Sequence, residues 1–239
     1  MDIRETKAVK EALALADLVR NSTNAIGEIT GPAGTGKSMC GRAVVRKLGA
    51  LRVTAWEGMT RHQLLNRVAA GIGIEGAHAA DKLLARSPEE ERVLIVFDEA
   101  NKMSWRLLEA IRYLCDECGI AALLVGTEFY TRKFTDARTR PLLEQLGSRI
   151  GAKRMSTRHL DRAETYAHVI RPTFGDLTDK ELVTAFWQGC RRGNYREAVE
   201  LAQECERLMQ ANGLQSLTAA TVELACKWMA NRHQTGGGL

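Results

Sequence analysis

A glycine-rich stretch near the start of the chain has the residue types that bind phosphate groups. Residues 31–38 read Gly-Pro-Ala-Gly-Thr-Gly-Lys-Ser, which matches the pattern Gly, four free positions, Gly, Lys, then Ser or Thr. The glycines allow successive backbone N–H groups to point into one concavity, which suits a polyphosphate. A following helix would add the positive end of its dipole. The stretch therefore predicts a phosphate-binding loop.

The side chains of this loop have separate predicted tasks. Lys37 is expected to reach the β- and γ-phosphates as a mobile point charge, and Ser38 to complete the coordination shell of Mg²⁺. The predicted cofactors are therefore ATP and Mg²⁺, and the alternative is a glycine-rich turn that matches by chance. The residues predicted to contact the nucleotide are Gly31, Pro32, Ala33, Gly34, Thr35, Gly36, Lys37, Ser38 and Met39.

A pair of acids follows the most apolar strand in the sequence. Residues 93–97 read Val-Leu-Ile-Val-Phe, which predicts a parallel strand buried on both faces, and Asp98 and Glu99 come directly after it. In phosphate-loop ATPases, a carboxylate at this position holds Mg²⁺ directly or through water, and a second acid polarises the attacking water. We assign Asp98 to the metal and Glu99 to the water. A solvated acidic turn is the alternative interpretation.

Two further positions could meet the γ-phosphate. Thr127 follows the predicted buried strand 121–125 and is a candidate sensor, unless it only caps the next turn. Residues 131–158 are rich in Lys and Arg, which by default indicates a solvated face. Within them, Arg149 lies between a helix predicted at 141–146 and a short strand predicted around 153–155. An arginine supplied there to a neighbouring subunit's nucleotide would stabilise charge on the transferring phosphoryl group.

The elements that must position these residues follow from hydrophobic periodicity. Strands are predicted at 26–30, 51–56, 93–97, 121–125 and 153–155, with crossover helices between them and an amphipathic helix at 4–20 before them. Beyond residue 157 the pattern is all helical, with segments at 161–170, 179–190, 195–212 and 218–231, separated by Pro172, Gly175, Gly193-Asn194 and Gly213. We therefore predict an α/β core with a parallel sheet over 1–157, a helical domain over 158–231 and a flexible tail over 232–239.

Bulk composition narrows the class of protein only a little. The chain has 239 residues, 45% of them hydrophobic, and a formal net charge of +5, which favours an anionic partner such as nucleic acid. No apolar run has membrane-spanning length and the N-terminus lacks a signal-peptide core, so a cytoplasmic protein without a membrane partner is expected. Six cysteines include a single CxxC pair, Cys115 and Cys118, for which reduced, packed cysteines are favoured over a zinc or redox site.

The order of these motifs resembles that of an AAA+ ATPase over residues 4–231. The resemblance implies that the helical domain is a lid over the nucleotide. An arginine at the start of the lid's third helix senses the γ-phosphate in that family. Residues 193–196 read Gly-Asn-Tyr-Arg and resemble this signature, so Arg196 is the candidate, against the alternative of a surface arginine after a turn.

Within AAA+ proteins, the sequence is similar to transposition regulators of the MuB, TnsC and IstB type. The likeness rests on residues 31–38, on Phe-Asp-Glu-Ala-Asn at 97–101, on Leu-Leu-Val-Gly-Thr-Glu at 123–128 and on Leu-Gly-Ser-Arg-Ile at 146–150. The last of these motifs strengthens Arg149 as an arginine finger. Two departures are that MuB carries an extra N-terminal DNA-binding domain, for which this chain has no room, and that Asn101 stands where many relatives have His or Gln.

This resemblance implies a bacterial or phage protein that assembles with ATP, often as a helical filament around duplex DNA, and that recruits a transposase, most plausibly that of a Mu-like phage. Binding of this kind would use phosphate contacts and would be salt-sensitive. The candidate DNA-contacting residues are Arg61, Lys82, Lys102 and Arg106. One or two of the four are expected to contact DNA, and the alternative for each is an ordinary surface charge. Two other AAA+ classes stay open, a helicase or replication loader and an ExeA-like secretion ATPase. A structural module with a degenerate ATP site is disfavoured by intact Lys37, Asp98 and Glu99.

Overall fold

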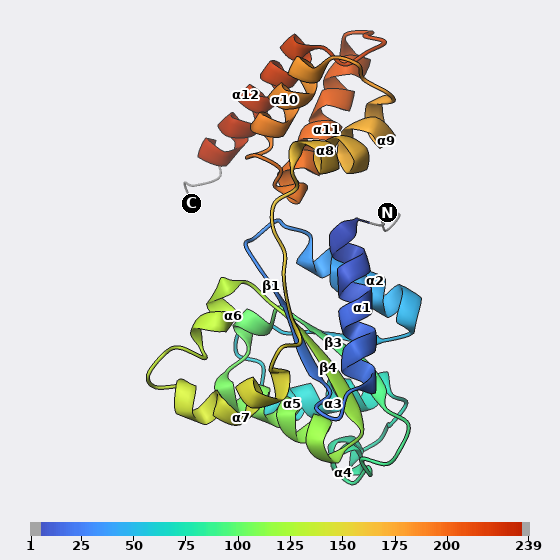
Figure 1. The fold of residues 1–239 in the computed structure, drawn as a ribbon, viewed down its shortest axis with the longest axis vertical. Coiled ribbons are helices and arrows are strands. Elements are labelled where there is room, and N and C mark those ends of the chain that lie inside the picture. The colour runs from blue at the N-terminus through green and yellow to red at the C-terminus, as the bar shows by residue number, and fades with distance from the viewer. Residues whose placement is uncertain (1–5, 236–239) are drawn as a thin grey trace. The chain divides into compact units, whose positions relative to one another are not determined.

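The computed structural model describes residues 6–235 (Figure 1), and the chain forms two compact units. The first unit runs to Ala33 and continues over Lys37–Thr157, while the second takes the loop tip Gly34–Gly36 and continues from Arg158. The elements of the first unit are α1 (Lys7–Asn21), β1 (Ile26–Thr30), α2 (Lys37–Leu48), β2 (Leu51–Thr54), α3 (Arg61–Gly71), α4 (Ala79–Leu84), β3 (Val93–Asp98), η1 (Ala100–Lys102), α5 (Trp105–Glu117), β4 (Ile120–Val125), α6 (Glu128–Arg132), α7 (Arg140–Ile150) and β5 (Arg154–Ser156).

The strands of the first unit form a five-stranded parallel sheet in the order β2-β3-β4-β1-β5. β3, β4 and β1 lie in its interior and consist almost entirely of buried residues, as the apolar runs predicted for β3 and β4. The register pairs Asp98 with Val125 on one side and with Thr54 on the other. The ends of β3 and β4 therefore lie at the same edge of the sheet, together with the loop that leaves β1.

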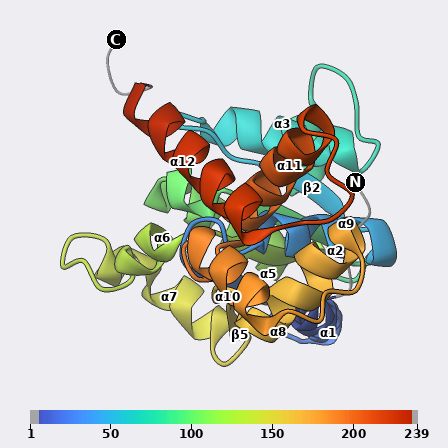
Figure 2. The same ribbon diagram turned by 90° about the horizontal axis from the view of Figure 1, so that it is seen from above.

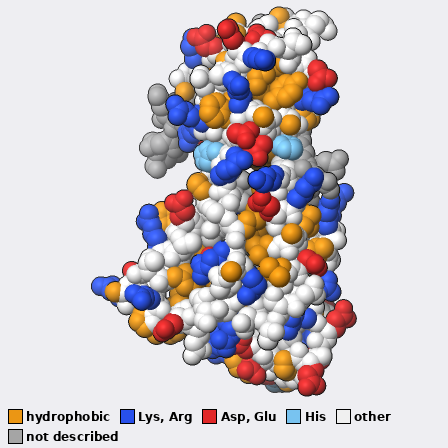
Figure 3. All heavy atoms as spheres, viewed as in Figure 1, with side chains coloured by type: hydrophobic (Ala, Val, Ile, Leu, Met, Phe, Trp, Pro, Cys, Tyr) orange, Lys and Arg blue, Asp and Glu red, His pale blue; other side chains and the backbone are white. Residues whose placement is uncertain are grey.

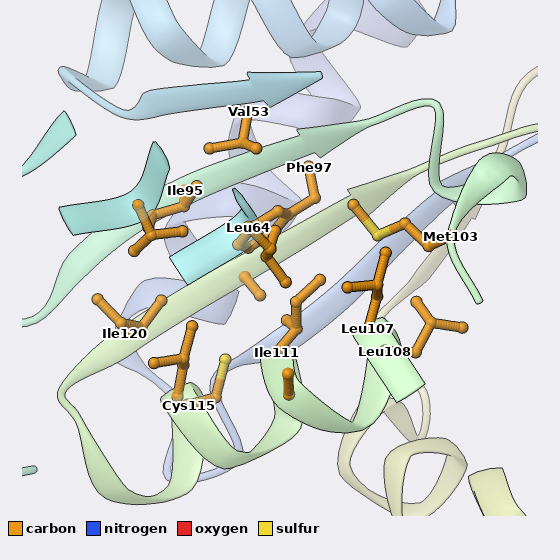
Figure 4. Close-up of a cluster of buried hydrophobic side chains, with 14 of the residues drawn as sticks. Val53, Leu64, Ile95, Phe97, Met103, Leu107, Leu108, Ile111, Cys115 and Ile120 are labelled. Atoms are coloured by element: carbon orange, nitrogen blue, oxygen red, sulfur yellow. The ribbon is translucent and has the colours of Figure 1, made fainter. Parts of the chain in front are cut away.

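Helices cover both faces of this sheet, and each face has its own hydrophobic core. On one face, α1 and α2 pack Val19, Val44 and their neighbours against Ile29, Val96 and Leu123. On the other face, α3, α5 and α7 pack against alternate residues of the same strands. Figure 4 shows this second core, in which Val53, Ile95 and Phe97 of the sheet meet Leu64, Leu107 and Ile111 of the helices. The predicted α/β fold class is confirmed by this sheet with helices on both faces.

Local sequence signals account for several helix starts. Thr60 caps α3 in a capping box with Gln63, because the Thr60 hydroxyl accepts from the Gln63 N–H and the Gln63 side chain accepts from the Thr60 N–H. Ser104 caps α5 by accepting from the Leu107 N–H at 3.4 Å. These caps fix where the crossover helices begin, and so where the preceding loops end.

The second unit is helical from Arg162 onward, and Figure 2 shows α10, α11 and α12 within it. Its three longest helices pack against one another around Phe186, Leu201 and Ala225, among other buried side chains. The helices of this unit are α8 (Arg162–Thr165), a π-helical segment η2 (Tyr166–Ile170), α9 (Arg171–Phe174), α10 (Lys180–Gly189), α11 (Tyr195–Ala211) and α12 (Ala219–Thr235).

The structure corrects four details of the sequence prediction. Pro172 does not separate two elements, because it occupies the first turn of α9, where a missing N–H costs nothing. The helix predicted at 141–146 extends to Ile150, and the strand predicted at 51–56 ends at Thr54. The last helix continues to Thr235, into the stretch predicted as a tail, and residues 236–239 of that tail lie outside the described residues.

The six cysteines are free, and all except the partly buried Cys226 are buried. Burial raises the pKa of the Cys40 thiol to about 11 and that of the Cys205 thiol to about 12, so both are thiols at neutral pH. In the part of the chain that the structure describes, no helix has the length and apolar character needed to cross a bilayer.

Candidate phosphate-binding site

The loop between β1 and α2 has the backbone conformation that the sequence pattern requires. Gly31, Gly34 and Gly36 have φ values of 146°, 78° and 86°, in the region that favours glycine. A Cβ on Gly31 would lie 2.4 Å from the carbonyl oxygen of Thr157, so a side chain is also excluded by space there. Helix α2 begins at Lys37, and the N–H groups of its first turn have no carbonyl partners within the helix. This loop and helix start are a ready-made anion site.

Lys37 is the first residue of α2, and its side chain lies back across the loop. Its Nζ donates a hydrogen bond to the Pro32 carbonyl oxygen at 2.5 Å, and the residue is buried. The ammonium group is therefore held beside the glycine-rich turn. The nine residues predicted to contact a nucleotide all lie in this loop and the first turn of α2.

Ser38 at the start of α2 and Asp98 at the end of β3 contact each other. The Ser38 Oγ donates to the Asp98 Oδ1 at 3.4 Å, although the two residues lie 60 positions apart in the sequence. The two oxygens suit Mg²⁺, which prefers oxygen ligands at 2.0–2.1 Å, so adjacent ligands lie about 3 Å apart. Mg²⁺ usually takes its other ligands from water and phosphate, so a hydroxyl and one carboxylate are a fitting protein contribution. The donor set therefore fits the predicted metal.

Glu99 has an unusual backbone conformation directly after Asp98. Its φ of 60° and ψ of 38° place it in the left-handed region, which costs a residue other than glycine about 1–3 kcal/mol. Its half-buried carboxylate contacts the side chains of Lys102 at 3.6 Å and Asn101 at 3.4 Å. Such strain accumulates at functional sites. The turn ends β3 abruptly and separates Glu99 from the strand's hydrogen-bond ladder.

Asn101 links the end of β3 to the end of β4, which the sequence interpretation did not foresee. Its Nδ2 donates to the Glu99 carboxylate, and its Oδ1 accepts from the Thr127 N–H at 3.2 Å. The carbonyl oxygens of Asn101 and Met103 are in turn held by the Lys133 ammonium, whose pKa burial lowers. The sequence marks Asn101 only as a residue that differs from the His or Gln of many relatives. It does not indicate the contacts with Glu99 and Thr127.

The Thr127 hydroxyl has no capping role. Thr127 occupies the N-cap position of α6, a helix that the sequence analysis missed, but its side chain makes no capping hydrogen bond. Its Oγ1 is buried and has no hydrogen-bond partner among residues 6–235, which the structure describes. A buried hydroxyl in this state costs free energy unless a ligand or water completes it. The geometry therefore removes the alternative that Thr127 only caps the next turn.

Arg52 was not predicted as a site residue, yet it makes a close contact with Asp98. Its guanidinium NH2 lies 2.5 Å from the Asp98 Oδ2, and the Asp98 side chain is only 4% exposed. The pair joins neighbouring strands β2 and β3. No local sequence pattern marks Arg52, because the contact depends on which strands become neighbours.

Arg149 lies elsewhere, within α7 rather than between a helix and a strand as predicted. Its guanidinium makes two bonds to the Asp116 carboxylate of α5, from Nε at 3.1 Å and from NH2 at 3.3 Å. Arg112 donates to the same carboxylate at 2.7 Å. The structure thus pairs Arg149 with Asp116 of α5. The contribution of Arg149 to a nucleotide site stays a prediction.

Arg196 is exposed at the second position of α11, in the second unit. The motif around it has a clear structural basis. Gly193 has a φ of 87°, and a Cβ there would lie 1.7 Å from the Leu160 carbonyl oxygen, so only glycine fits. Asn194 then caps the helix by accepting from the Glu197 N–H at 3.2 Å. The motif therefore places Arg196 in a fixed first turn.

The four predicted DNA-contacting residues are all exposed in the first unit. Lys102 also pairs with Glu99, and the Arg106 guanidinium lies over the Trp105 ring at 4.5 Å from its centroid. Figure 3 shows Lys and Arg side chains dispersed over the visible face of this unit, with acidic and neutral groups among them. Arg61 begins α3 and Lys82 lies in α4.

Comparisons with known proteins show which proteins this part of the chain is similar to. Residues 19–134 match the AAA domain family. A potential ATP-binding protein of Staphylococcus aureus is 28% identical over 141 residues, which are 55% of this chain and 49% of that protein. The Mu-like prophage FluMu DNA transposition protein B of Haemophilus influenzae is 30% identical over 124 residues, 50% of this chain and 42% of that protein. The chain thus spans about half the length of the curated relatives it matches.

Solved structures agree on the fold. The Aeropyrum pernix ORC2 protein in its ADP form has a TM-score of 0.66 and 18% identity, covering 95% of this chain and 69% of that one. Drosophila ORC bound to DNA has a TM-score of 0.69 and 15% identity, covering 95% and 61%. The predicted resemblance to AAA+ ATPases of the MuB type is confirmed by the Haemophilus relative and by these folds. Residues 19–134 of this chain thus match the AAA domain family, and the chain has the fold of P-loop AAA+ ATPases.

Proposed function

We propose that this protein is an ATP- and Mg²⁺-dependent ATPase that binds duplex DNA without sequence preference, oligomerises on it and delivers it as a target to a transposase. One observation carries the enzymatic part: Lys37, Ser38 and Asp98 converge at the loop between β1 and α2. The similarity to a DNA transposition protein supports the biological part.

The nucleotide's phosphates would be held by the glycine-rich loop, the first turn of α2 and Lys37. Ser38 and Asp98 would hold Mg²⁺, which when bound supplies positive charge to the phosphate oxygens. Glu99 would orient the attacking water, since it directly follows the proposed metal ligand Asp98 at the end of β3. The unpartnered Thr127 hydroxyl is suited to donate a hydrogen bond to the γ-phosphate.

Hydrolysis would depend on assembly, because the proposed arginine finger acts on another subunit. Arg149 is tied to Asp116 within its own chain, and it would exchange this carboxylate for a neighbour's phosphate. Arg196 of the helical lid would sense the γ-phosphate, as the resemblance implies. ATP binding would therefore favour the assembled, DNA-gripping state and hydrolysis would release it.

Binding to DNA would use phosphate contacts from the exposed basic residues. Arg61, Lys82, Lys102 and Arg106 are the proposed contacts. Affinity would then fall steeply with salt, because each neutralised phosphate releases counterions. A sequence preference would be weak for the same reason, since phosphates carry no base information.

Electron microscopy with an ATPase assay tests this proposal. Purified protein would be imaged with ATP or a slowly hydrolysed analogue, with and without duplex DNA, beside the Lys37→Ala variant. Nucleotide-dependent filaments on DNA that disappear in Lys37→Ala are the expected result. Monomers or small closed rings without duplex binding would contradict the filament and favour a loader that acts on another protein.

A further inference from the structure

The salt bridge between Arg52 and Asp98 is the contact that the proposed mechanism does not use. Asp98 is 3% exposed, and both oxygens of its carboxylate accept hydrogen bonds from groups of the protein. The Oδ1 accepts from the Ser38 hydroxyl at 3.4 Å and from the Glu99 N–H at 2.9 Å, while the Oδ2 accepts from Arg52 at 2.5 Å. The guanidinium supplies the only full positive charge among these three donors.

A buried carboxylate needs such a charge. Removing an ionised carboxylate from water is strongly unfavourable unless a cation or several hydrogen bonds compensate. Mg²⁺ and the Arg52 guanidinium are both cations that would compensate the same group. Because they repel each other at short range, one weakens the binding of the other.

The position of Arg52 would allow its guanidinium to move away from Asp98. It lies in β2, an edge strand of the sheet, and its side chain is 31% exposed. Alternation along the strand puts Val53 into the hydrophobic core on one face, and hence Arg52 on the opposite face, which α2 covers. Arg52 can therefore swing from Asp98 toward solvent without disturbing that core.

We infer that Arg52 is the counter-ion of Asp98 when the site holds no metal, and that Mg²⁺ and Arg52 compete for this carboxylate. This inference rests on the proposed function, because it takes Asp98 as part of the metal site. The consequence is that Mg²⁺ alone binds weakly. The nucleotide's phosphates bring the extra negative charge that makes displacement of the guanidinium favourable. Arg52 thus couples metal entry to nucleotide binding.

Metal binding measured directly tests the inference without relying on hydrolysis. Mn²⁺ would serve as the probe, with its free concentration followed by electron paramagnetic resonance, in the absence and presence of ADP. Arg52→Gln leaves Asp98 buried without its counter-ion, which raises the free energy of the metal-free state. The Mn²⁺ concentration at half-saturation should therefore fall about tenfold relative to wild type, equivalent to about 1.4 kcal/mol.

Arg20→Gln is a matched control, since Arg20 has a side-chain exposure of 38% and pairs only loosely with Glu91 at 3.9 Å. It should leave the Mn²⁺ midpoint unchanged. Arg52→Gln with Asp98→Asn should lose Mn²⁺ binding, since neither charge remains. If Arg52→Gln fails to fold, Arg52→Lys decides, because it keeps a charge but loses the planar guanidinium and should lower the midpoint by a smaller factor.

A folded Arg52 variant with an unchanged or higher Mn²⁺ midpoint overturns the inference, because Arg52 would then be irrelevant to the metal or would brace Asp98 for it. The proposed function fails in a different way. Wild-type protein would then bind neither ADP nor Mn²⁺ in the presence of ADP, whatever the variant does.

Discussion

The end of β3 and the pair of helices α5 and α7 each hold an acid against arginine, but the neighbours of the two acids differ. Asp98 is 4% exposed in its side chain and shares its carboxylate between Arg52, Ser38 and the backbone of Glu99. Asp116 is 19% exposed and meets two arginines, Arg112 and Arg149. The same ion-pair chemistry therefore serves two uses. At the strand end the acid also bonds Ser38 of the phosphate-binding loop, and between the helices the acid pairs with Arg149 of α7.

Arg149→Ala gives the largest expected effect and tests whether Arg149 acts as the proposed arginine finger. An arginine finger contributes about 10³-fold or more to phosphoryl transfer, so the ATPase rate of the assembled protein should fall by that order. Nucleotide binding by dilute, unassembled protein should not change, since Arg149 contacts Asp116 in its own chain. Steady-state ATPase with duplex DNA and fluorescent-nucleotide binding measure the two quantities.

Arg112→Ala is the control for this comparison. It removes another arginine from the same carboxylate, so any loss caused only by the change of charge around Asp116 appears in both variants. Equal loss in the two variants would make Arg149 structural. The pair of Asp116 and Arg149 would then only stabilise the fold.

Glu99→Gln tests the strand end. The amide keeps the size and the hydrogen bond with Asn101 but cannot polarise water, so hydrolysis should fall by roughly 10²-fold or more, while nucleotide affinity stays near that of wild type. Single-turnover hydrolysis and equilibrium binding of a fluorescent ATP analogue check both parts. Hydrolysis within a few-fold of wild type would assign the water to another group.

Asn101→Ala tests the link between β3 and β4 and should have a smaller effect. It removes the contacts to the Glu99 carboxylate and to the Thr127 N–H, so hydrolysis should slow about tenfold with little change in affinity, as a 1 Å misplacement of a catalytic group costs up to about 10². Asn66→Ala is the matched control, because Asn66 is not at the site and bonds only to His62 at an exposed helix face. A similar loss in both variants would remove Asn101 from the site.

The sequence predicted the parts of this site that a local pattern determines. The glycine-rich loop with its following helix is one continuous stretch of sequence and the two acids at the end of β3 are another, so a local pattern indicates each of them. The partners of those residues come from other strands and helices. Arg52 reaches Asp98 only because β2 pairs with β3, and Arg149 reaches Asp116 only because α7 packs on α5. The sequence could not supply such contacts, since they depend on tertiary packing.

The backbone strain at Glu99 is a second feature that the sequence did not predict. Nothing in Phe-Asp-Glu-Ala-Asn indicates that Glu99 takes a left-handed conformation, because Glu is not a residue that favours it. The missed helix α6 has a related cause. It is only a single turn of five residues, too short for periodicity to register, and it is held by Tyr130, whose ring is fully buried.

A third acid that pairs with an arginine is Glu28, and its expected effect is the smallest. Glu28 lies in the middle of β1 with 2% exposure and pairs with Arg154 of β5 at 2.7 Å. Burial raises the pKa of this carboxyl above its ordinary value of 4.5, and the Arg154 charge opposes the shift only in part. Unlike Asp98, it has no place at the phosphate loop, so its ionisation should change stability and leave nucleotide binding alone.

The sign follows from proton linkage. Between pH 4.5 and its raised folded value, Glu28 binds more protons in the folded state than in the unfolded state, so stability falls as pH rises through this window. Glu28→Gln has no charge to bury and should lack this contribution. The difference in unfolding free energy between variant and wild type should therefore move in favour of the variant with rising pH, as measured by urea unfolding from pH 4.5 to 7.5. A difference that is constant over this range would show that Glu28 is compensated by Arg154 at every pH, and the strand centre would then resemble the strand end after all.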